Sequence, residues 1–405
     1  MTLTAAQEKA LKEIKRWLSN TEQQEFTLAG YAGSGKTTLL QEFINSQENL
    51  VLCVAPTGKA ASVLSKRLEN VRVTTIHAAL YKPVVANPGK LEDLIMESVN
   101  DPDNKELKEA IERERERLRL AKLGFAVNEK HRIEPGQLVI VDEASMVTNR
   151  IREDLYRTGA KVLYVGDPGQ LPPVREKGFF AEVVPDVMLT DILRQALDSP
   201  IIRLSMQIRN GQTIEFGDYS GVRKCFKEDV SADEWLTYDQ VVTGTNVSRR
   251  KVNRFFRTKK YPGERSIYPM KGDKLICLKN EAEDGVFYIN GVPASCLEAT
   301  TKVPNQPWIV APEILYEDEI LKDVALWPRG FEMHYLDVKE DLPFERTGLR
   351  QFDYAYAITV HKSQGSEWDR VLLADDQMSG GDRNFRRLWL YTAVTRAKKE
   401  LLWLV

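Results

Sequence analysis

A glycine-rich stretch that ends in lysine and threonine is the part of the chain best suited to chemistry. Residues 30–38 read GYAGSGKTT and have the spacing G-x-x-x-x-G-K-T of a phosphate-binding loop. Backbone N–H groups of such a loop point at phosphate oxygens, so we expect Lys36 to reach the β- and γ-phosphates and Thr37 to hold Mg²⁺. The other predicted nucleotide contacts of the loop are Gly30, Gly33, Ser34, Gly35 and Thr38. The sequence therefore predicts a nucleoside triphosphate site, and a plain strand-to-helix turn is the competing interpretation.

Two carboxylates and an amide follow apolar runs further along the chain. Asp142 and Glu143 come directly after a predicted buried strand at 137–141, and Gln170 follows another at 161–165. Parallel α/β sheets bind ligands at the carboxyl ends of their strands. Asp142 suits Mg²⁺, Glu143 suits a base that orients the attacking water, and Gln170 suits a sensor of the γ-phosphate. A surface turn is the alternative for the carboxylates alone.

The elements that must position these residues form an α/β pattern. A short apolar strand at 26–29 precedes the loop, and apolar residues at helical spacing follow it at 38–44. Residues 5–18 have the apolar face of an amphipathic helix, and this helix carries Gln7. Thr57 follows the apolar run at 51–54 and can cap the next helix. The predicted fold class is therefore α/β.

Composition sets the broad class of protein. The chain has 405 residues, enough for two or more domains, with 42% hydrophobic and 29% charged residues. No apolar run approaches the length of a membrane span, the N-terminal segment is charged, and the four cysteines form no C-x-x-C pair. These features predict a soluble, cytoplasmic protein with no membrane partner. With a net charge of −2, any nucleic acid would bind in a local groove and not on a polycationic surface.

Motifs beyond the phosphate loop show a family resemblance. In order, they are LTDILRQ at 189–195, QVVTGTN at 240–246, YAITVHKSQGSE at 356–367 and LYTAVTRA at 390–397. Together with the loop, this order resembles the superfamily 1B DNA helicases of the Dda and RecD type. The resemblance implies arginine fingers at Arg194 and Arg396, each with a surface salt bridge as the alternative interpretation. It also implies that Gln7 contacts adenine and that Glu367 lies near the ribose or the second face of the nucleotide.

The resemblance also implies a domain organisation. The expected architecture has two RecA-like P-loop domains with parallel sheets, the first at 1–80 and 136–190 and the second at 191–262 and 345–405. Residues 81–135 would form an inserted helical, pin-type segment. An SH3-like β-barrel is expected at 263–344, where short strands alternate around an Asn-Gly turn. Phe125 would lie on a strand-separating pin, and a small core contact is an equal alternative.

The implied DNA path crosses both domains. Hydroxyl and amide groups would contact phosphates, and rings would offer stacking that tolerates any base sequence. The positions implied for single-stranded DNA are Pro56, Thr57, Thr75, His77, Thr243, Asn246, Thr359, His361 and Gln364. Such a groove needs few lysines, which agrees with the near-neutral total charge.

We therefore expect an ATP- and Mg²⁺-dependent DNA helicase that moves 5′→3′ on single-stranded DNA and opens tailed duplexes, most simply as a monomer. Replication or repair proteins are its expected partners. Two alternatives stay open on the sequence alone. One is an RNA helicase, because no residue is an obvious reader of the 2′-hydroxyl group. The other is a non-translocating DNA-dependent ATPase subunit of a larger repair complex.

Overall fold

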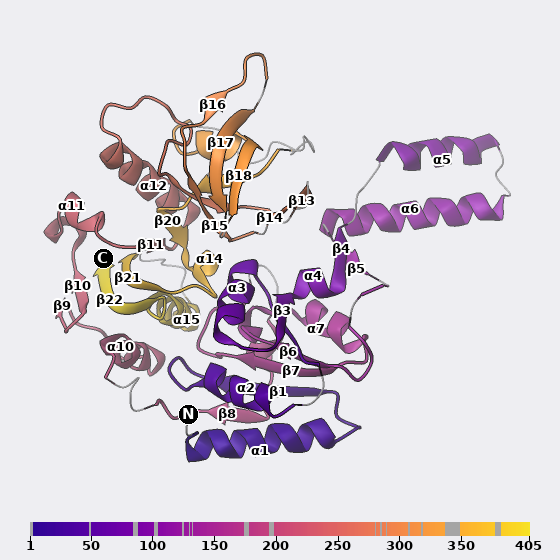
Figure 1. The fold of residues 1–405 in the computed structure, drawn as a ribbon, viewed down its shortest axis with the longest axis horizontal. Coiled ribbons are helices and arrows are strands. Elements are labelled where there is room, and N and C mark those ends of the chain that lie inside the picture. The colour runs from indigo at the N-terminus through magenta and orange to yellow at the C-terminus, as the bar shows by residue number, and fades with distance from the viewer. Residues whose placement is uncertain are drawn as a thin grey trace.

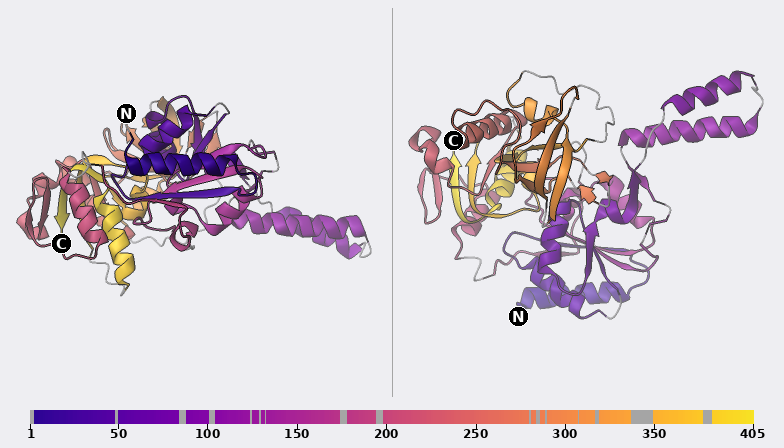
Figure 2. Two further views of the ribbon diagram at one scale, coloured as in Figure 1. Left: turned by 90° about the horizontal axis from the view of Figure 1, so that it is seen from below. Right: turned by 45° about the horizontal axis from the view of Figure 1, so that its top comes forward.

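The computed structural model shows two parallel sheets side by side, an antiparallel sheet above them and a helical hairpin that projects to one side (Figure 1). Figure 2 shows the hairpin clear of the other elements in both of its views. The structure describes residues 3–47, 50–83, 88–100, 104–123, 125–128, 130–131, 133–173, 178–193, 198–279, 281–283, 286–288, 290–306, 308–316, 319–336, 349–376 and 382–405.

The first half of the molecule is built on a sheet of six described strands in the order β3-β2-β6-β7-β1-β8, and all of its pairings are parallel. Its strands are β1 (Glu25–Gly30), β2 (Leu52–Ala55), β3 (Arg72–Thr75), β6 (Leu138–Val141), β7 (Lys161–Gly166) and β8 (Val187–Leu189). Its helices are α1 (Ala5–Ser19), α2 (Lys36–Asn45), α3 (Gly58–Arg67), α4 (Ile76–Leu80), η1 (Ala144–Met146), α7 (Asn149–Tyr156) and α8 (Phe179–Glu182).

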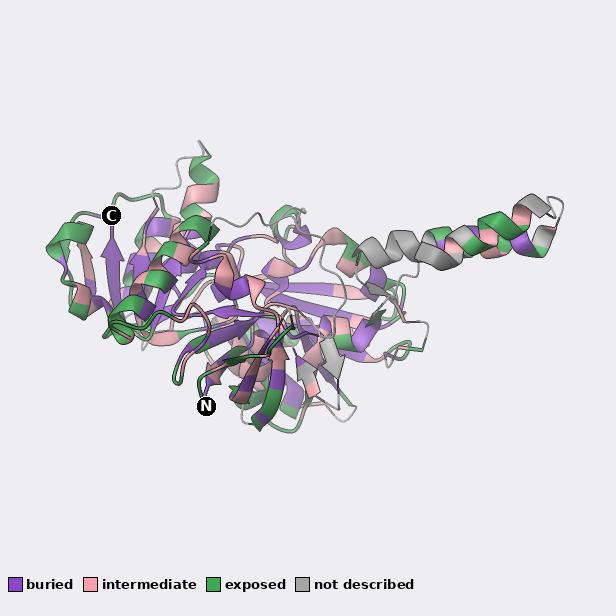
Figure 3. Ribbon diagram, turned by 90° about the horizontal axis from the view of Figure 1, so that it is seen from above, coloured by how far each residue is buried: buried purple, intermediate pink, exposed green. Residues whose placement is uncertain are grey.

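Alternate residues of the central strands build a separate core on each face of this sheet. Leu28, Cys53 and Ile140 pack with α1, α2 and α3, whereas Val54 and Val139 pack with α4, α7 and α8. Figure 3 shows the buried residues concentrated in these strands. Strands covered on both faces are apolar along their whole length, which is why β6 (LVIV) shows no polar alternation in the sequence.

The second half has a sheet of six described strands in the order β20-β11-β21-β22-β10-β9, parallel except for the pair β9–β10. Its strands are β9 (Gly217–Asp218), β10 (Val222–Cys225), β11 (Gln240–Thr243), β20 (Ala357–Thr359), β21 (Trp368–Ala374) and β22 (Ala397–Leu404). Its helices are α10 (Pro200–Arg209), η2 (Lys227–Asp229), α11 (Ala232–Trp235), α12 (Asn246–Lys260), α14 (Val360–Ser363) and α15 (Arg383–Val394).

The two parallel sheets share one strand order. Taken along the chain, β10, β11, β20, β21 and β22 occupy the sheet positions that β1, β2, β3, β6 and β7 occupy in the first half. Asp142 follows β6 and Asp375 follows β21, so these two carboxylates occupy corresponding places. The expected α/β class with parallel sheets is thus present in both halves.

Two further units interrupt this pattern. A two-stranded stalk, β4 (Tyr81–Pro83) with β5 (Phe125–Val127), carries the projecting helices α5 (Pro88–Asn100) and α6 (Lys105–Leu123). The backbone of Phe125 pairs with Pro83 in this stalk. The antiparallel sheet has the order β16-β17-β15-β12-β19, with β18 paired to β17, and a core of its own. Its elements are β12 (Lys274–Cys277), β15 (Pro293–Cys296), β16 (Thr301–Lys302), β17 (Ile309–Tyr316), β18 (Glu319–Leu326), β19 (Phe352–Tyr354) and α13 (Arg329–Glu332), with the separate hairpin β13 (Glu281–Glu283) and β14 (Val286–Tyr288).

A buried polar stripe on α12 fastens the antiparallel sheet to the second half. Arg249, Asn253 and Arg257 recur every four residues and lie on one helix face. Arg249 forms an ion pair with Asp353 of β19, and Arg257 Nε lies 3.0 Å from Asp273 Oδ2. Asn253 Nδ2 donates to the carbonyls of Tyr354 and Ala357, each at 3.1 Å. Because every one of these buried groups is paired, the stripe fixes the orientation of the sheet as well as its attachment.

Within the described part of the chain, no helix has both the length and the apolar character needed to cross a membrane.

Candidate nucleotide site and nucleic-acid interface

A cavity of about 520 Å³ lies where the two halves meet. The first half contributes the phosphate loop together with Asp142, Glu143 and Gln170, and the second half contributes Glu367 and Arg396. The first-half residues come from the carboxyl ends of β1, β6 and β7 and from the segments that follow them, whereas Glu367 and Arg396 directly precede β21 and β22. The structure therefore brings sequence-distant predicted site residues to one cavity.

The phosphate loop has the backbone that its glycines allow. Gly33 and Gly35 have φ of 79° and 77°, in the left-handed region that glycine adopts at no steric cost. Lys36 begins α2, and its Nζ donates to the carbonyl of Gly30 at 2.7 Å and to that of Tyr31 at 3.1 Å. The ammonium group is thus held over its own loop, where phosphate oxygens would replace these carbonyls.

Gln7 braces the loop from α1. It is only 3% exposed, and its Nε2 donates to the carbonyls of Ser34 at 3.3 Å and Gly35 at 3.2 Å. Its Oε1 accepts the N–H of Thr4, which caps the helix. The implied contact between Gln7 and adenine stays a prediction, and in this state the side chain binds the loop itself.

Three carboxyl groups of the first half, those of Asp142, Glu143 and Asp167, line the cavity. Burial raises the pKa of Asp142 and of Asp167, and it raises the pKa of Glu143 to about 7, with repulsion from Asp142 as the second cause. Arg396 and Lys36 act in the opposite direction on Glu143. Glu143 also has φ 51° and ψ 41°, a left-handed conformation that is costly for a residue with a side chain. A carboxylate with a pKa near neutrality is suited to accept a proton from water at pH 7.

Two unpaired polar atoms fit a nucleotide and the water that would attack it. Ser34 Oγ, in the loop, and Gln170 Oε1 are both buried and have no hydrogen-bond partner among the described residues. Ser34 can donate to a phosphate oxygen, and Gln170 Oε1 can accept from a water molecule. Thr37 and Asp142 line the same cavity and supply oxygen atoms of the kind that Mg²⁺ prefers.

Arg396 enters the cavity wall from the second half. The residue is 3% exposed, and its guanidinium donates to the carbonyls of Thr392 at 3.0 Å and Ser366 at 2.9 Å. A further bond reaches Thr395 Oγ1 at 3.1 Å. These bonds hold the guanidinium in a fixed orientation, and no ion pair within 4 Å engages it in the described part of the chain. The other predicted finger, Arg194, lies outside the described residues.

Glu367 bridges the two halves. Its Oε2 lies 2.7 Å from the Arg67 guanidinium at the end of α3, and both residues line the cavity. Its implied place near the ribose stays a prediction. Arg67 had no distinguishing pattern in the sequence.

Tyr391 and Asp167 are site residues that the sequence did not single out. The Tyr391 hydroxyl donates to Asp167 Oδ2 at 2.8 Å and accepts the N–H of Ala32, in the phosphate loop, at 2.9 Å. Gly169 lies so near that a Cβ on it would come within 2.9 Å of the Tyr391 ring. One hydroxyl of the second half therefore joins the loop and a buried carboxyl of the first. The only signal was the position of Tyr391 five residues before Arg396 in one motif.

Four threonines cap helices at the carboxyl ends of parallel strands, two in each half. Thr57, Thr75, Thr245 and Thr359 each accept a backbone N–H in the first turn of α3, α4, α12 and α14 respectively. They follow β2, β3, β11 and β20, which are corresponding strands of the two sheets. Helix N-termini bind phosphate through free N–H groups and the helix dipole. Thr245 was not among the predicted contacts, although the other three were.

The remaining predicted DNA contacts differ in exposure. Asn246 is exposed, whereas Pro56, His77 and His361 are half-buried. The His361 ring stacks on Phe385 with centroids 6.3 Å apart, and burial lowers the pKa of His77 and of His361, so both rings are neutral at pH 7.

Two predicted DNA contacts are instead engaged inside the protein. Thr243 is fully buried, and its hydroxyl donates to the carbonyl of Thr245 at 3.4 Å. Gln364 is also buried, and its Nε2 donates to the carbonyl of Leu171 at 2.7 Å. The N–H of the same Leu171 donates to Thr392 Oγ1 at 2.9 Å. In this state, Gln364 therefore joins the two halves.

The geometry defines a P-loop nucleoside triphosphatase whose site is shared by two halves. Residues 2–223 match the family model described as "AAA domain", and residues 354–405 match the one described as "UvrD-like helicase C-terminal domain". Since the first match spans more than half of the chain, the chain belongs to this AAA domain family, and within it to the superfamily 1B helicases.

Curated relatives match along almost the whole chain. The chain is 28% identical over 397 residues to the ATP-dependent RecD2 DNA helicase of Deinococcus radiodurans, covering 92% of this chain and 45% of the relative. It is 25% identical to the RecBCD enzyme subunit RecD of Mycobacterium tuberculosis, covering 92% and 65%. It is 26% identical to the ATP-dependent DNA helicase Pif1 of Campylobacter jejuni, covering 91% and 86%. The chain thus spans about half to two thirds of the length of the first two relatives.

Solved structures share the fold. The Pif1 helicase from Candida albicans aligns with a TM-score of 0.53 at 18% identity, covering 100% of this chain and 94% of that one. The Pif1 helicase from Bacteroides in complex with ADP-AlF3 and single-stranded DNA aligns at 0.50 and 19%, covering 100% and 92%. At these identities the likeness shows a Pif1-like α/β fold. The SH3-like barrel and the pin stay predictions.

Proposed function

We propose that this protein is an ATP-dependent DNA helicase that moves 5′→3′ on single-stranded DNA. The observation that carries the proposal is the shared cavity, in which the phosphate loop and two carboxylates of one half face an arginine of the other. A site divided in this way links nucleotide binding to the distance between the halves. The relatives named as DNA helicases support the same activity.

The residues of the cavity have complementary roles in hydrolysis. The loop amides and Lys36 bind the phosphates, and Glu143 takes a proton from the attacking water. Gln170 positions that water, and Arg396 stabilises the charge that grows on the transferred phosphoryl group. Mg²⁺, held by Thr37 and Asp142, would neutralise charge on the phosphate oxygens. The buried surroundings strengthen each of these electrostatic effects because little water screens them.

The four capped helices are the proposed contacts to the DNA backbone. Two lie in each half, so closure around ATP would change the spacing between the two pairs of phosphate contacts. His77 and His361 lie in the first turn of the second helix of each pair, α4 and α14, as neutral rings suited to stacking on bases. Helix N-termini bind phosphate through backbone N–H groups and the helix dipole. A chain of net charge −2 therefore needs no strongly basic surface for these contacts.

Unwinding of tailed duplexes tests the proposed activity and its direction. The protein should open a duplex with a 5′ single-stranded tail and leave blunt and 3′-tailed duplexes closed. Opening of the 3′-tailed substrate alone would reverse the direction. ATPase stimulation by oligo-dT, compared with oligo-U, distinguishes DNA from RNA. Stimulation without any unwinding would favour the non-translocating ATPase subunit.

A His361→Ala variant tests the DNA path independently of the chemistry. We expect it to keep its basal ATPase rate, to lose much of the stimulation by single-stranded DNA and to unwind poorly. His131→Ala is a matched control outside the proposed path. If DNA stimulation is unchanged in His361→Ala, the histidine does not contact DNA.

A further inference from the structure

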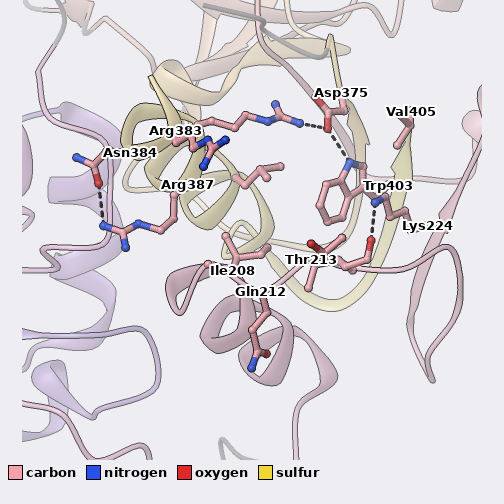
Figure 4. Close-up of a pocket in the computed structure, with 14 residues that line it drawn as sticks. Ile208, Gln212, Thr213, Lys224, Asp375, Arg383, Asn384, Arg387, Trp403 and Val405 are labelled. Atoms are coloured by element: carbon pink, nitrogen blue, oxygen red, sulfur yellow. Dashed lines mark hydrogen bonds and ion pairs between the residues drawn. The ribbon is translucent and has the colours of Figure 1, made fainter. Parts of the chain in front are cut away.

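A second cavity, of about 630 Å³, lies within the second half, and none of its described lining residues also lines the nucleotide cavity. It opens between α10, α15 and the ends of β10, β21 and β22 (Figure 4). Its volume is within the range of sites that take small molecules or a few peptide residues. Its uncharged lining includes Ile208, Thr213, Ile214, Leu390, Trp403 and Val405.

The cavity combines an apolar floor with a cationic rim. Its floor is formed by aliphatic side chains and the indole of Trp403, which is 3% exposed. Its charged lining residues are the cations Lys224, Arg383, Arg386 and Arg387 and the carboxylate Asp375. Among the described residues, the lining therefore has three more positive than negative charges around an apolar hollow. A ligand that fits must be both acidic and partly apolar.

The cations differ in the number of hydrogen-bond and ion-pair partners that they already have within the protein. Arg386 forms an ion pair with Asp375, and its Nη1 is buried without a hydrogen-bond partner in the described structure. Arg383 has no carboxylate partner among the described residues, and Arg387 donates only to Asn384 Oδ1 and to a carbonyl. Figure 4 shows Arg383, Asn384 and Arg387 on α15, across the cavity from Lys224 and Trp403. Two exposed guanidinium groups are thus available to an anion.

Glu215 interacts with Lys224 from outside the lining, and two further carboxylates lie close to the lining in sequence. Asp376 accepts the N–H of Thr245 at 2.8 Å, and Asp382 accepts the N–H of Asn384 at the start of α15. Neither residue lines the cavity in the described part of the chain. Asp375 is already paired twice, since its Oδ2 also accepts the Trp403 Nε1–H at 2.9 Å.

The same geometry argues against nucleic acid as the occupant. Single strands bind by stacking bases on accessible rings. Among the described residues, Trp403 is the only aromatic ring in the lining, and Lys224 Nζ covers it at 4.7 Å from the ring centroid. A phosphate backbone would meet the arginines but would leave the apolar floor unfilled.

We propose that this cavity binds an acidic peptide segment of a partner protein, with a large apolar side chain on the floor and carboxylates at Arg383 and Arg387. Such a segment matches both parts of the lining, the apolar area by burial and the rim by charge complementarity. The site is separate from the nucleotide cavity, so its occupant would bring the protein to a partner without blocking hydrolysis.

Fluorescence anisotropy with a labelled octapeptide, six aspartates followed by Leu-Phe, tests the proposal on the full chain without ATP or DNA. The peptide should bind, binding should weaken with added salt, and a version with Phe replaced by Ala should bind less tightly. The charge-reversed pair Arg383→Glu with Arg387→Glu should weaken binding at least about tenfold. The pair Lys12→Glu with Lys15→Glu on α1 carries the same charge change and should leave binding intact.

Other outcomes would overturn the proposal. Equal losses in the two charge-reversed pairs would mean non-specific attraction. No peptide binding to the wild type, together with weaker oligo-dT binding in the Arg383/Arg387 pair alone, would assign the rim to nucleic acid. A Thr213→Trp variant, which places a ring at the cavity mouth, should also block the peptide. DNA-stimulated ATPase should be unchanged in all these variants, so failure of this proposal is distinguishable from failure of the helicase proposal.

Discussion

The two halves have the same strand order but use the same sheet edge for opposite purposes. In the first half, β1 leads into the phosphate loop and the ten-residue helix α2, whereas β10 leads into the three-residue turn η2. Asp142, after β6, faces the cavity between the halves, whereas Asp375, after β21, is held by Arg386 and Trp403. We call the end of β6, with Asp142 and the strained Glu143, the reactive edge, and the end of β21, where the Asp375 carboxylate is paired, the paired edge.

The two halves contribute different kinds of residue to the shared cavity. Burial raises the pKa of Asp142, Glu143 and Asp167, which lie in the first half, and Glu143 also has a positive φ that is costly for a residue with a side chain. The second half contributes Arg396 and Tyr391, both held by fixed hydrogen bonds. The second half carries no phosphate loop. Rigidly held side chains suit this half, because they must reach a fixed position at the nucleotide when the two halves close.

The largest expected effect comes from the reactive edge. Lys36→Ala should reduce ATP hydrolysis to background by removing the cation at the phosphates. Glu143→Gln should lower kcat by about 10³-fold or more while ATP still binds, because the amide cannot accept the proton. Steady-state ATPase and nucleotide-binding assays measure both. Near-normal turnover in Glu143→Gln would remove that residue from the role of base.

The pH profile sharpens this assignment. Since the pKa of Glu143 is about 7 and the base acts when deprotonated, kcat/KM, which follows ionisation of the free enzyme, should rise with pH through about 7 in the wild type. The raised pKa also means that ionised Glu143 destabilises the fold, an effect absent below its ordinary pKa of about 4.5 and complete above about 7. Glu143→Gln should therefore raise Tm at pH 8 and bring no gain at pH 4.5. Calorimetry at the two pH values measures this.

The second expected effect tests the contribution of the opposite half. Arg396→Ala should lower kcat by about 10³-fold while weakening ATP binding far less, because its contact strengthens as phosphoryl charge develops. Arg370→Ala is a control, because this arginine is exposed and pairs with Glu400 away from the cavity. A loss of ATP affinity at constant kcat would make Arg396 a binding residue and refute closure as the catalytic step.

A smaller effect is expected from the paired edge. Asp375→Asn should lower the free energy of unfolding by about 1.5–3 kcal/mol, because it weakens charged hydrogen bonds to Arg386 and Trp403. The kcat for ATP should stay near that of the wild type at temperatures where the variant is folded. Asp142→Asn should do the reverse, with lost turnover and no loss of stability. Urea unfolding and ATPase assays on the Asp375→Asn and Asp142→Asn variants measure these effects. Equal effects of the two substitutions would show that the two carboxylates do not differ in role.

Local signals in the sequence predicted the reactive edge well. The phosphate loop, Asp142 and Glu143 lie at one cavity because residues at the carboxyl ends of parallel strands converge in space, and Arg396 reaches this cavity from the start of β22 in the other half. The repeated strand–helix alternation likewise predicted the α/β class. Short-range spacing is enough for these features, since each motif holds its own strand, turn and helix start.

Contacts that join distant segments were not predictable in the same way. Nothing near Tyr391 in sequence reports that its hydroxyl reaches Ala32 and Asp167, more than 200 positions away. Gln364 has the chemistry of a DNA contact, but in this state it is engaged by Leu171, and that pairing depends on how the halves pack. A residue type indicates what a side chain can do, and the tertiary fold decides which partner it meets.

The smallest expected effect concerns the ion pair that joins the halves, Arg67 with Glu367. Its atoms are 2.7 Å apart, but both side chains are more than a third exposed, so water and salt screen the attraction. A double-mutant cycle with Arg67→Ala and Glu367→Ala should give a coupling energy of about 0.2–1 kcal/mol in the free energy of unfolding. If the pair instead orders the closed nucleotide site, the same cycle measured on KM for ATP will give a larger coupling than the cycle on stability. Equal, small values in both would show that the halves are joined mainly by the buried bonds of Tyr391 and Gln364, with this surface pair a minor contact.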